Sequence, residues 1–363
     1  MLACRTSTKA HHARRQVRLK RRSLRRWAIA LLALDKRLAL NLRNRRPSLG
    51  HRSSCDRRDK RVDKAVLGFV VLSHNNPPQL RKLCDTLNTL YEKPPIAVHH
   101  DQSQSTVDRQ HFSDNVAFVE NPLVTGWGGW SVTEAVLKGL ARLYQGFDPN
   151  WFTLLSAADY PVMVAESVRD VLRTTRADAF VDLHPLSSKH QHRHFGTQDP
   201  ALAHHDNKAL GRKRYLHARL DLGLLRPKKV GGNQTVRLPF ASPFNPFTSS
   251  YQCYVGSQWL TGNRKTAERI LRPSSKDVAY QRYLRKRWHA DESYINTVIG
   301  NDPQLVVDVN PRRFTRWSDG GAHPETLTEN DLDAARSAEA FFARKFAHGS
   351  AAVQALDREL KLL

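Results

Sequence analysis

Apolar and polar residues follow one another in blocks that predict buried strands joined by amphipathic helices. The run 66–72 (VLGFVVL) is continuously apolar, which is typical of a strand buried on both faces of a sheet. After a polar turn, leucines recur at helical spacing over 79–90, which predicts a helix. Strands are predicted again at 96–101, 116–120 and 151–155, with a helix at 132–144. This alternation favours an α/β fold with a mainly parallel central sheet flanked by helices.

The pattern is less regular in the second half of the chain. Residues 189–246 are rich in His, Arg and Pro with little periodicity, and we expect an irregular excursion there. Ordered structure resumes over 251–260, followed by a helix at 264–271. A further helix is predicted with Asp291 and Glu292 at its start, and a terminal helix runs from Asp331 onward.

Polar side chains follow the first, second and fourth predicted strands. They are His74 and Asn75, then His100 and Asp101, then Asp159. Because ligands of such sheets bind at the carboxyl ends of the strands, we expect these residues to converge on one crevice. Helix capping or turn formation is the alternative role for the two aspartates.

A turn rich in Gly and Trp lies between the third strand and the second helix. Trp127 and Gly128 stand in the sequence Gly-Trp-Gly-Gly-Trp-Ser of residues 126–131. Glycine lets a backbone approach a ligand closely, and an indole can stack on a sugar or base. Tight packing of the turn between a strand and a helix accounts for the pattern equally well.

Two charged pairs further along are candidates for catalysis. Asp291 and Glu292 precede an apolar helix, where an acidic pair either complements the helix dipole or supplies a general base on a rigid element. Arg344 and Lys345 lie between two phenylalanines in what we expect to be a late helix. These cations either neutralise a departing diphosphate or form a solvated helix face.

The net charge of +24 is concentrated at one end of the chain. Residues 1–64 contain 21 Lys and Arg against four Asp, so they carry 17 of the 24 net charges. The apolar stretch 27–34 within them is too short to cross a bilayer. We predict that 1–64 is a basic, disordered extension. Contact with an anionic membrane surface and non-specific binding to nucleic acid are the alternatives.

Cysteine and histidine positions argue against a metal site. The four cysteines are widely spread and no pair has zinc-ligand spacing, which favours a reducing, intracellular setting. The histidines between 184 and 205 lie in a basic segment without ligand spacing, so solvated loop histidines are the preferred interpretation. The sequence contains no Gly-rich phosphate loop and no nucleophile elbow.

In order and spacing, these segments resemble the core-2/I-branching family of glycosyltransferases, which includes peptide O-xylosyltransferases and plant glucuronosyltransferase-like members. The resemblance covers the chain from Leu67 to about Phe346. The sequences Ser-Ala-Ala-Asp-Tyr-Pro (156–161) and Phe-Ala-Arg-Lys-Phe (342–346) look most like the xylosyltransferases, and His-Pro-Glu-Thr-Leu-Thr (323–328) looks more like the plant members. Further segments that carry the resemblance are Val-Val-Leu-Ser-His (70–74), Val-His-His-Asp (98–101), Trp-Gly-Gly-x-Ser (127–131), Gly-Ser-Gln-Trp (256–259), Asp291-Glu292 and Trp317.

The resemblance implies a GT-A-like nucleotide-sugar-binding fold over 65–350, followed by a helical tail at 351–363. It implies an inverting transfer from a UDP-sugar, UDP-GlcNAc or UDP-xylose, to a hydroxyl of a glycan, glycolipid or protein, with Glu292 as the general base. Lys345 with Arg344 would stabilise the UDP leaving group. The remaining implied contacts are His74, Asn75, His100 and Asp101 on the donor, and Trp127, Gly128, Asp159, Trp259, Asp291 and Trp317 around the sugar and acceptor.

Two departures from the family pattern qualify these expectations. Animal members carry paired cysteines and an N-terminal membrane anchor, neither of which is found here, so we expect a cytoplasmic enzyme, peripheral to the membrane if its basic end contacts lipid. A family arginine that grips the diphosphate has no direct counterpart, and Arg312, Arg313 and Arg316 are the nearest candidates. Family members typically lack a metal-binding Asp-x-Asp, so no cofactor is expected. We also expect no specific nucleic acid partner. The alternative hypothesis is a basic binding protein without catalysis.

Overall fold

The computed structural model describes residues 67–185, 246–285, 290–317 and 323–362, and the backbone of strands β8 (Arg219–Asp221) and β9 (Thr235–Arg237). A seven-stranded sheet is its central element. All neighbouring strands of this sheet are parallel except at β11, which runs antiparallel to both of its neighbours. In spatial order the strands are β12 (Val307–Asp308), β6 (Ala179–Phe180), β11 (Thr261–Asn263), β4 (Trp151–Ser156), β1 (Leu67–Ser73), β2 (Ile96–His100) and β3 (Val116–Phe118).

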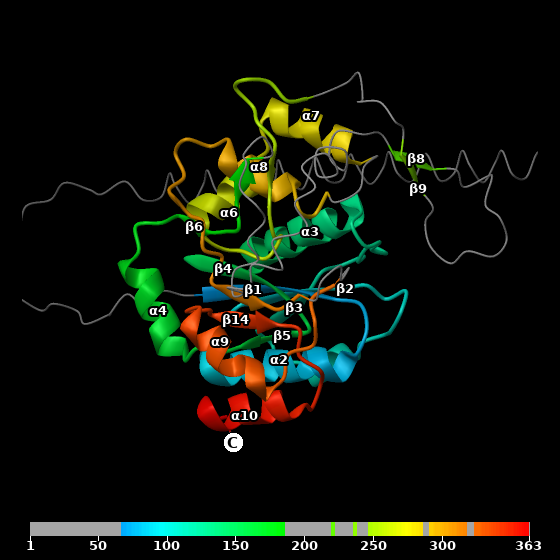
Figure 1. Cartoon of the computed structure of the whole chain (residues 1–363). Coiled ribbons are helices and arrows are strands. Elements are labelled where there is room, and N and C mark those ends of the chain that lie inside the picture. Colours follow the sequence, from blue (N-terminus) through cyan, green and yellow to red (C-terminus); the bar gives the residue numbers. More distant parts are fainter. Residues whose placement is uncertain are drawn as a thin grey trace, which may run out of the picture. The chain divides into compact units, whose positions relative to one another are not determined.

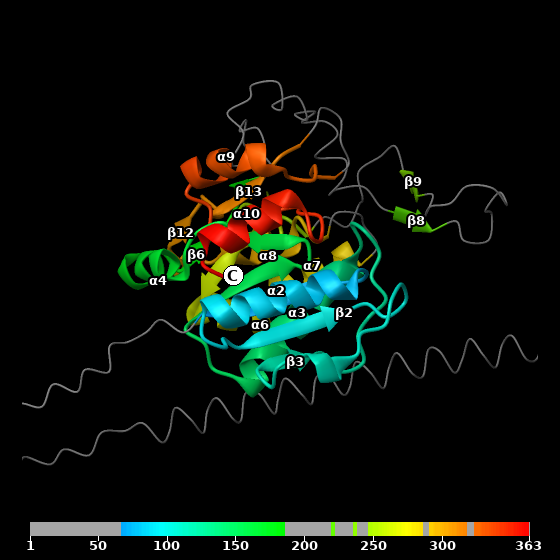
Figure 2. The same ribbon diagram turned by 90° about the horizontal axis from the view of Figure 1, so that it is seen from below.

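Helices cover both faces of the sheet (Figure 1). One face carries α3 (Trp130–Gly146), α6 (Arg264–Leu271), α7 (Ser275–Leu284) and α8 (Tyr294–Gly300). The other carries α2 (Pro77–Leu90), α9 (Leu332–Ser337) and α10 (Ala351–Glu359), and α10 lies alongside α2 (Figures 1 and 2). Strand β1 contributes Phe69 and Val71 to one core and Val70 to the other, all fully buried. The expected α/β class with a mainly parallel sheet is confirmed, and it is consistent with a GT-A-like fold.

A second sheet of three strands lies on the α2 face of the first. It consists of β5 (Asp159–Pro161), β14 (Phe342–Arg344) and β13 (Arg313–Thr315), with β14 in the middle. The ring of Phe342 contacts that of Phe69 in β1, with centroids 5.9 Å apart. The predicted late helix around Arg344 and the single terminal helix from Asp331 are therefore wrong. Burial of Phe342 and pairing with two strands outweigh local helix propensity, so strand β14 separates α9 from α10.

Several helices begin where local sequence signals place them. Asn76 precedes a proline pair at the start of α2, and its side chain accepts the N–H of Gln79 at 3.2 Å. Asn263 caps α6 in the same way, through the N–H of Thr266. No helix was expected from the sequence at α4 (Ala165–Thr174) or α7, and the helix expected to start with Asp291 starts at Tyr294 instead. Shorter elements are η1 (Arg109–His111), η3 (Glu329–Asp331), β7 (His184–Pro185) and β10 (Tyr254–Val255).

The carboxyl ends of the three central strands are level with one another. Ser73 of β1 pairs with His100 of β2, and Leu72 pairs with Ser156 of β4. The residues that follow these strands therefore emerge at one edge of the sheet, as the sequence predicts. Among the helices described, none is long and apolar enough to span a bilayer. The predicted extension 1–64 and most of the irregular excursion at 189–246 lie outside the described residues.

Candidate active site

Asp159 is a buried anchor for two arginines. It stands at the start of β5, and its side chain has no exposed surface. Its carboxylate accepts hydrogen bonds from Nη1 of Arg313 at 2.7 Å and from Nε of Arg344 at 2.9 Å. The hydroxyl and the amide of Ser156 donate to the same carboxylate at 2.7 and 3.1 Å. A buried carboxylate needs such donors to compensate for its loss of contact with water, and through them Asp159 holds Arg344 in place.

Arg344 and Lys345 are adjacent in the chain, but their side chains differ in their partners. The guanidinium of Arg344 lies over the ring of the buried Trp259, 4.5 Å from its centroid, while Asp159 holds its Nε. Burial lowers the pKa of Arg344, and burial together with the charge of Arg344 lowers the pKa of Lys345. Lys345 is half-buried and forms no ion pair with any other described residue. Its ammonium is therefore the cation that an anionic ligand can use.

His323 connects this cationic pair to the Trp127 turn. Its ring meets the ring of Trp127 edge to face, with centroids 5.5 Å apart. Burial and the charges of Lys345 and Arg344 lower the pKa of His323, so the imidazole is neutral at physiological pH. The segment that bears it is fastened next to Lys345, because the N–H of Lys345 donates to the carbonyl of Glu325 at 3.3 Å.

The Trp127 turn is shaped by its own hydrogen bonds. The amide of Gly126 donates to the hydroxyl of Ser131 at 2.9 Å, and the amide of Gly129 donates to the carbonyl of Gly126 at 2.9 Å. Gly128 has φ of +66°, a left-handed conformation that favours glycine. Its carbonyl accepts the N–H of Ala290 at 3.4 Å. The turn thus lies directly against the residue that precedes Asp291 and Glu292.

Glu292 is held from two sides through its backbone. Its carbonyl oxygen accepts the N–H of Gly256 at 3.0 Å and Nδ2 of Asn296 at 3.2 Å. Its own amide donates to Oδ1 of Asp291 at 3.2 Å. Both acidic side chains are half-buried in the turn before α8, two and three residues ahead of its first residue, Tyr294. The backbone that carries the Glu292 carboxylate is therefore fixed, as a general base on a rigid element requires.

These contacts close into a ring of segments that are distant in sequence. Glu292 contacts Gly256, and Trp259 in the same segment contacts Arg344. The amide of the neighbouring Lys345 donates to Glu325, two residues after His323, and the His323 ring contacts Trp127. The Trp127 turn then returns through Ala290 to Glu292. The backbone of Glu292 and the cationic pair thereby belong to one closed set of contacts, which includes the aromatic rings of Trp259 and Trp127.

The residues after β1 and β2 lie at the edge of the sheet and differ in exposure. His74 and Asn75 are exposed, whereas His100 and Asp101 are buried. The two ring nitrogens of His100 lie 3.1 Å from the Ser73 hydroxyl and 2.8 Å from the Ser105 carbonyl. Burial lowers the pKa of His100, so its imidazole is neutral within these contacts.

Asp101 fastens the loop that leads to the Trp127 turn. Its carboxylate accepts the amide and hydroxyl of Thr125 at 2.6 and 2.8 Å and the amide of Ser103 at 2.9 Å. Burial by itself would raise the pKa of Asp101, but these hydrogen bonds outweigh it and lower the pKa to about 2. The neighbouring His99 accepts the N–H of Leu123 at 2.9 Å, and burial lowers its pKa to about 4. Contact of Asp101 with a nucleotide stays a prediction.

Comparison with known sequences places most of these segments within one family match. The profile of the Core-2/I-Branching enzyme family matches residues 67–339, well over half of the chain. The chain belongs to this family. It is also similar to the Beta-glucuronosyltransferase GlcAT14B of Arabidopsis thaliana, with 25% identity over 318 residues. That alignment covers 81% of this chain and 66% of the plant protein. The resemblance drawn from the sequence is thus confirmed for the family.

The three arginines nearest to the family's missing diphosphate contact all have carboxylate partners. Arg313 is 4% exposed and pairs with Asp159. Arg312 pairs with Glu339 on the surface. Arg316 pairs with Glu325 and with Asp331, and its carbonyl accepts the N–H of Glu325 at 2.8 Å. Arg316 thus fastens the segment that carries His323, and the half-buried Trp317 follows it directly.

The Asp-x-Asp sequence in this family member, Asp331-Leu332-Asp333, does not stand at a strand end. Asp331 accepts the amide and hydroxyl of Thr328 and pairs with Arg316, while Asp333 is on the surface of α9 beside Arg336. Among the described side chains there is also no group of three or more His, Cys, Asp or Glu that could hold a metal ion. Independence from metal stays a prediction.

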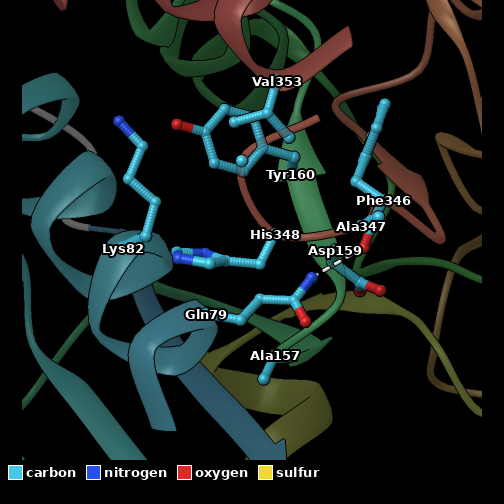
Figure 3. Close-up of a pocket in the computed structure, with 10 residues that line it drawn as sticks. Gln79, Lys82, Ala157, Asp159, Tyr160, Phe346, Ala347, His348 and Val353 are labelled. Atoms are coloured by element: carbon cyan, nitrogen blue, oxygen red, sulfur yellow. Dashed lines mark hydrogen bonds between the residues drawn. The ribbon is translucent and has the colours of Figure 1, made fainter. Parts of the chain in front are cut away.

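A small cavity lies behind Asp159, between α2 and the segment that follows β14 (Figure 3). The side chain of Gln79 points across it, and its Nε2 donates to the carbonyl of Phe346 at 2.6 Å. With a volume of about 10 Å³ the cavity has room for roughly one water molecule and not for a sugar. The cavity is therefore part of the packing around β5 and β14 and not a substrate site. Its lining residues are Gln79, Lys82, Ala157, Asp159, Tyr160, Phe346, Ala347, His348, Gly349 and Val353.

The structural roles of three residues around the site were not predicted from the sequence. Arg313 shares Asp159 with Arg344, His323 joins Lys345 to Trp127, and Asp182 supports the segment that contacts Glu292. Asp182 follows β6, so the strand-end rule that pointed to Asp101 could have found it. The partnership of Arg313 has no local signal, since it depends on the pairing of distant strands.

Proposed function

We propose that this chain is an inverting glycosyltransferase that moves a sugar from a UDP-sugar to an acceptor hydroxyl. The observation that carries the proposal is the ring of contacts that holds Glu292 and the Arg344–Lys345 pair around one site. A transferase of this kind needs a base on the acceptor side and positive charge at the leaving group. Membership in the Core-2/I-Branching enzyme family supports the same reaction class.

In the proposed reaction Glu292 takes the proton of the acceptor hydroxyl as its oxygen attacks the anomeric carbon. A new carbon–oxygen bond forms while the bond from that carbon to the β-phosphate oxygen breaks, and the bond's electrons leave with UDP. One displacement of this kind inverts the anomeric configuration. The carboxylate of Glu292 needs to be ionised, which the ordinary pKa of glutamic acid allows at neutral pH.

Lys345 is the residue proposed to neutralise the departing diphosphate. Its ammonium has no ion pair in the described part of the chain, whereas the charge of Arg344 is partly balanced by Asp159. Arg344 then acts through its position on Trp259 and its field on Lys345. A fixed cation at a developing negative charge stabilises the transition state without reorganisation.

The other predicted contacts are distributed around this centre. His74 and Asn75 at the end of β1, with His100 and Asp101 behind them, form the proposed nucleotide side. Trp127, Gly128, Trp259, Asp291 and Trp317 form the sugar and acceptor side, with Asp159 acting through Arg344. The side chain of Asp159 is fully buried, which does not support a direct contact with the sugar.

Several finer features belong to the same proposal. The donor is UDP-GlcNAc or UDP-xylose, and the name of the plant relative adds UDP-glucuronate to the donors that need testing. The acceptor is a hydroxyl of a glycan, glycolipid or protein, and the reaction requires no metal. The basic residues 1–64 are proposed to contact anionic lipid from the cytoplasm.

Thermal stabilisation of the full chain by UDP and a panel of UDP-sugars tests the proposal. Ligand at about a hundred times its dissociation constant adds roughly 2.7 kcal/mol to the free energy of unfolding. We expect a shift with UDP that survives EDTA and does not grow with Mn²⁺, and the donor sugar that transfers to an acceptor names the substrate. Absence of any shift with nucleotides would overturn the donor site and favour a basic binding protein.

A further inference from the structure

Asp182 contacts the segment that holds the proposed base. Asp182 follows β6 and is 6% exposed. Directly before it, Val181 continues the sheet, since its N–H donates to the carbonyl of Asp308 at 3.0 Å. One carboxylate oxygen accepts the N–H of Ser257 at 2.8 Å, and the other lies 2.6 Å from Nε2 of His184. Both oxygens are thus engaged inside the protein, so the side chain acts on the protein rather than on a substrate.

The contact of the Asp182 side chain with Ser257 lies just beyond the end of the pairing between β7 and β10. Strands β7 and β10 pair antiparallel through His184 and Val255, and Gly256 then leaves the ladder. The backbone carbonyl of Asp182 packs so tightly on Gly256 that a Cβ there would lie 1.8 Å from it. The carboxylate of Asp182 then takes the next amide, that of Ser257. Asp182 thereby fixes both residues of the Gly256–Ser257 segment.

The same segment also holds Glu292. The amide of Gly256 donates to the Glu292 carbonyl at 3.0 Å. Nδ2 of Asn296 spans the two segments, with contacts of 3.2 Å to the Glu292 carbonyl and 3.4 Å to the Ser257 carbonyl. Displacement of Gly256 or Ser257 would therefore move the backbone of Glu292.

We propose that Asp182 is a positioning residue for Glu292, acting through Gly256 and Ser257. This inference rests on the proposed function, in which Glu292 is the base. A base must lie within hydrogen-bonding distance of the acceptor hydroxyl, and a displacement of about 1 Å costs roughly 10²-fold in rate. An ionised acceptor also holds the Ser257 amide more strongly than a neutral one.

The test compares Asp182→Asn, Asp182→Ala and Gly256→Ala with the matched control Asp178→Asn in the full chain. Asp178 precedes the same strand and also accepts backbone and side-chain donors, Val306 N–H and Asn263 among them, but it has no contact with the Gly256 segment. We expect kcat to fall about tenfold in Asp182→Asn and about a hundredfold in the other two variants, with the Kd for UDP unchanged. Asp178→Asn should lose stability and keep kcat.

Amide hydrogen exchange of Ser257 provides a readout that does not depend on activity. We expect faster exchange at Ser257 in Asp182→Asn and not in Asp178→Asn. Wild-type kcat in Asp182→Asn, or a loss explained by weaker UDP binding, would overturn the inference. If Glu292→Gln were fully active, the proposed base itself would be wrong, and this outcome is separate from a failure of Asp182 alone. Should Asp182→Ala fail to fold, the isosteric Asp182→Asn variant and the exchange measurement decide.

Discussion

The Nε atom of Arg344 lies 2.9 Å from a carboxylate oxygen of Asp159, although the two residues are 185 positions apart in the sequence. The pairing of β14 with β5 places them opposite each other, so backbone and side-chain contacts reinforce one another. The same carboxylate holds Arg313 of β13, and it therefore joins all three strands of the small sheet. The guanidinium also lies over the ring of Trp259, so two contacts hold Arg344, the residue directly before Lys345.

Replacing Asp159 with Asn should destabilise the protein strongly. The substitution leaves two buried guanidinium groups without their counter-charge, and breaking a buried ion pair typically costs about 3–5 kcal/mol. Chemical denaturation of Asp159→Asn measures this loss. The control is Asp333→Asn, which breaks a surface pair with Arg336 and should change stability by less than about 1 kcal/mol. Similar losses in both variants would contradict the anchoring role of Asp159.

Replacing Lys345 with Met should slow the transfer step. The ammonium is the proposed stabiliser of the leaving diphosphate, and loss of one such group typically lowers kcat by about 10²–10³-fold. Steady-state kinetics with the donor identified by the binding screen provide the measurement. Lys276→Met serves as the control, since Lys276 is a surface residue that contacts Ser250. A Lys345→Met variant with unchanged kcat would remove Lys345 from the proposed mechanism.

Replacing Glu292 with Gln should remove the general base while keeping the size of the side chain. We expect kcat to fall by about 10²–10⁴-fold, the range that general base catalysis contributes, with little change in the Kd for UDP. Glu166→Gln on α4 is the control, because Glu166 is 70% exposed and pairs with Arg169 on the surface. Equal activity of the two variants would show that another group takes the proton.

The free energy of unfolding should decrease in two separable steps as the pH is lowered, the first because of His99 and the second because of Asp101. The folded pKa of His99 is lowered to about 4, so the unfolded chain binds a proton more readily between about pH 6.5 and 4. Stability is full above that window and falls through it by up to about 3 kcal/mol. The pKa of Asp101 is lowered to about 2, so its contribution is present above about pH 4 and is lost toward pH 2.

Denaturation curves measured across this pH range test both steps. His99→Gln keeps an acceptor for the Leu123 amide but does not titrate, so it should flatten the step between pH 6.5 and 4. Asp101→Asn should flatten the lower step in the same way. His111→Gln, a surface histidine, is the control and should leave both steps in place. Wild-type pH dependence in His99→Gln would show that other groups cause the first step.

The sequence by itself determined the elements whose signals are local. The continuous apolar run at β1 predicted a strand buried on both faces, and the Asn76 and proline start of α2 needs no distant contact. Parallel strands bring their carboxyl ends together, so the convergence of the residues after β1, β2 and β4 followed from the pattern as well. The order of these segments was enough to point to the family.

Only the tertiary structure decided what the short, ambiguous segments do. The three residues of β14 are compatible with a helix, and they form a strand because β5 and β13 pair with them on both sides. The arginine partners of Asp159 and the support of Glu292 by Gly256 and Asp182 likewise join residues far apart in the chain. Such contacts depend on which surfaces pack together. Hydrophobic burial over the whole domain sets that packing, and no local propensity encodes it.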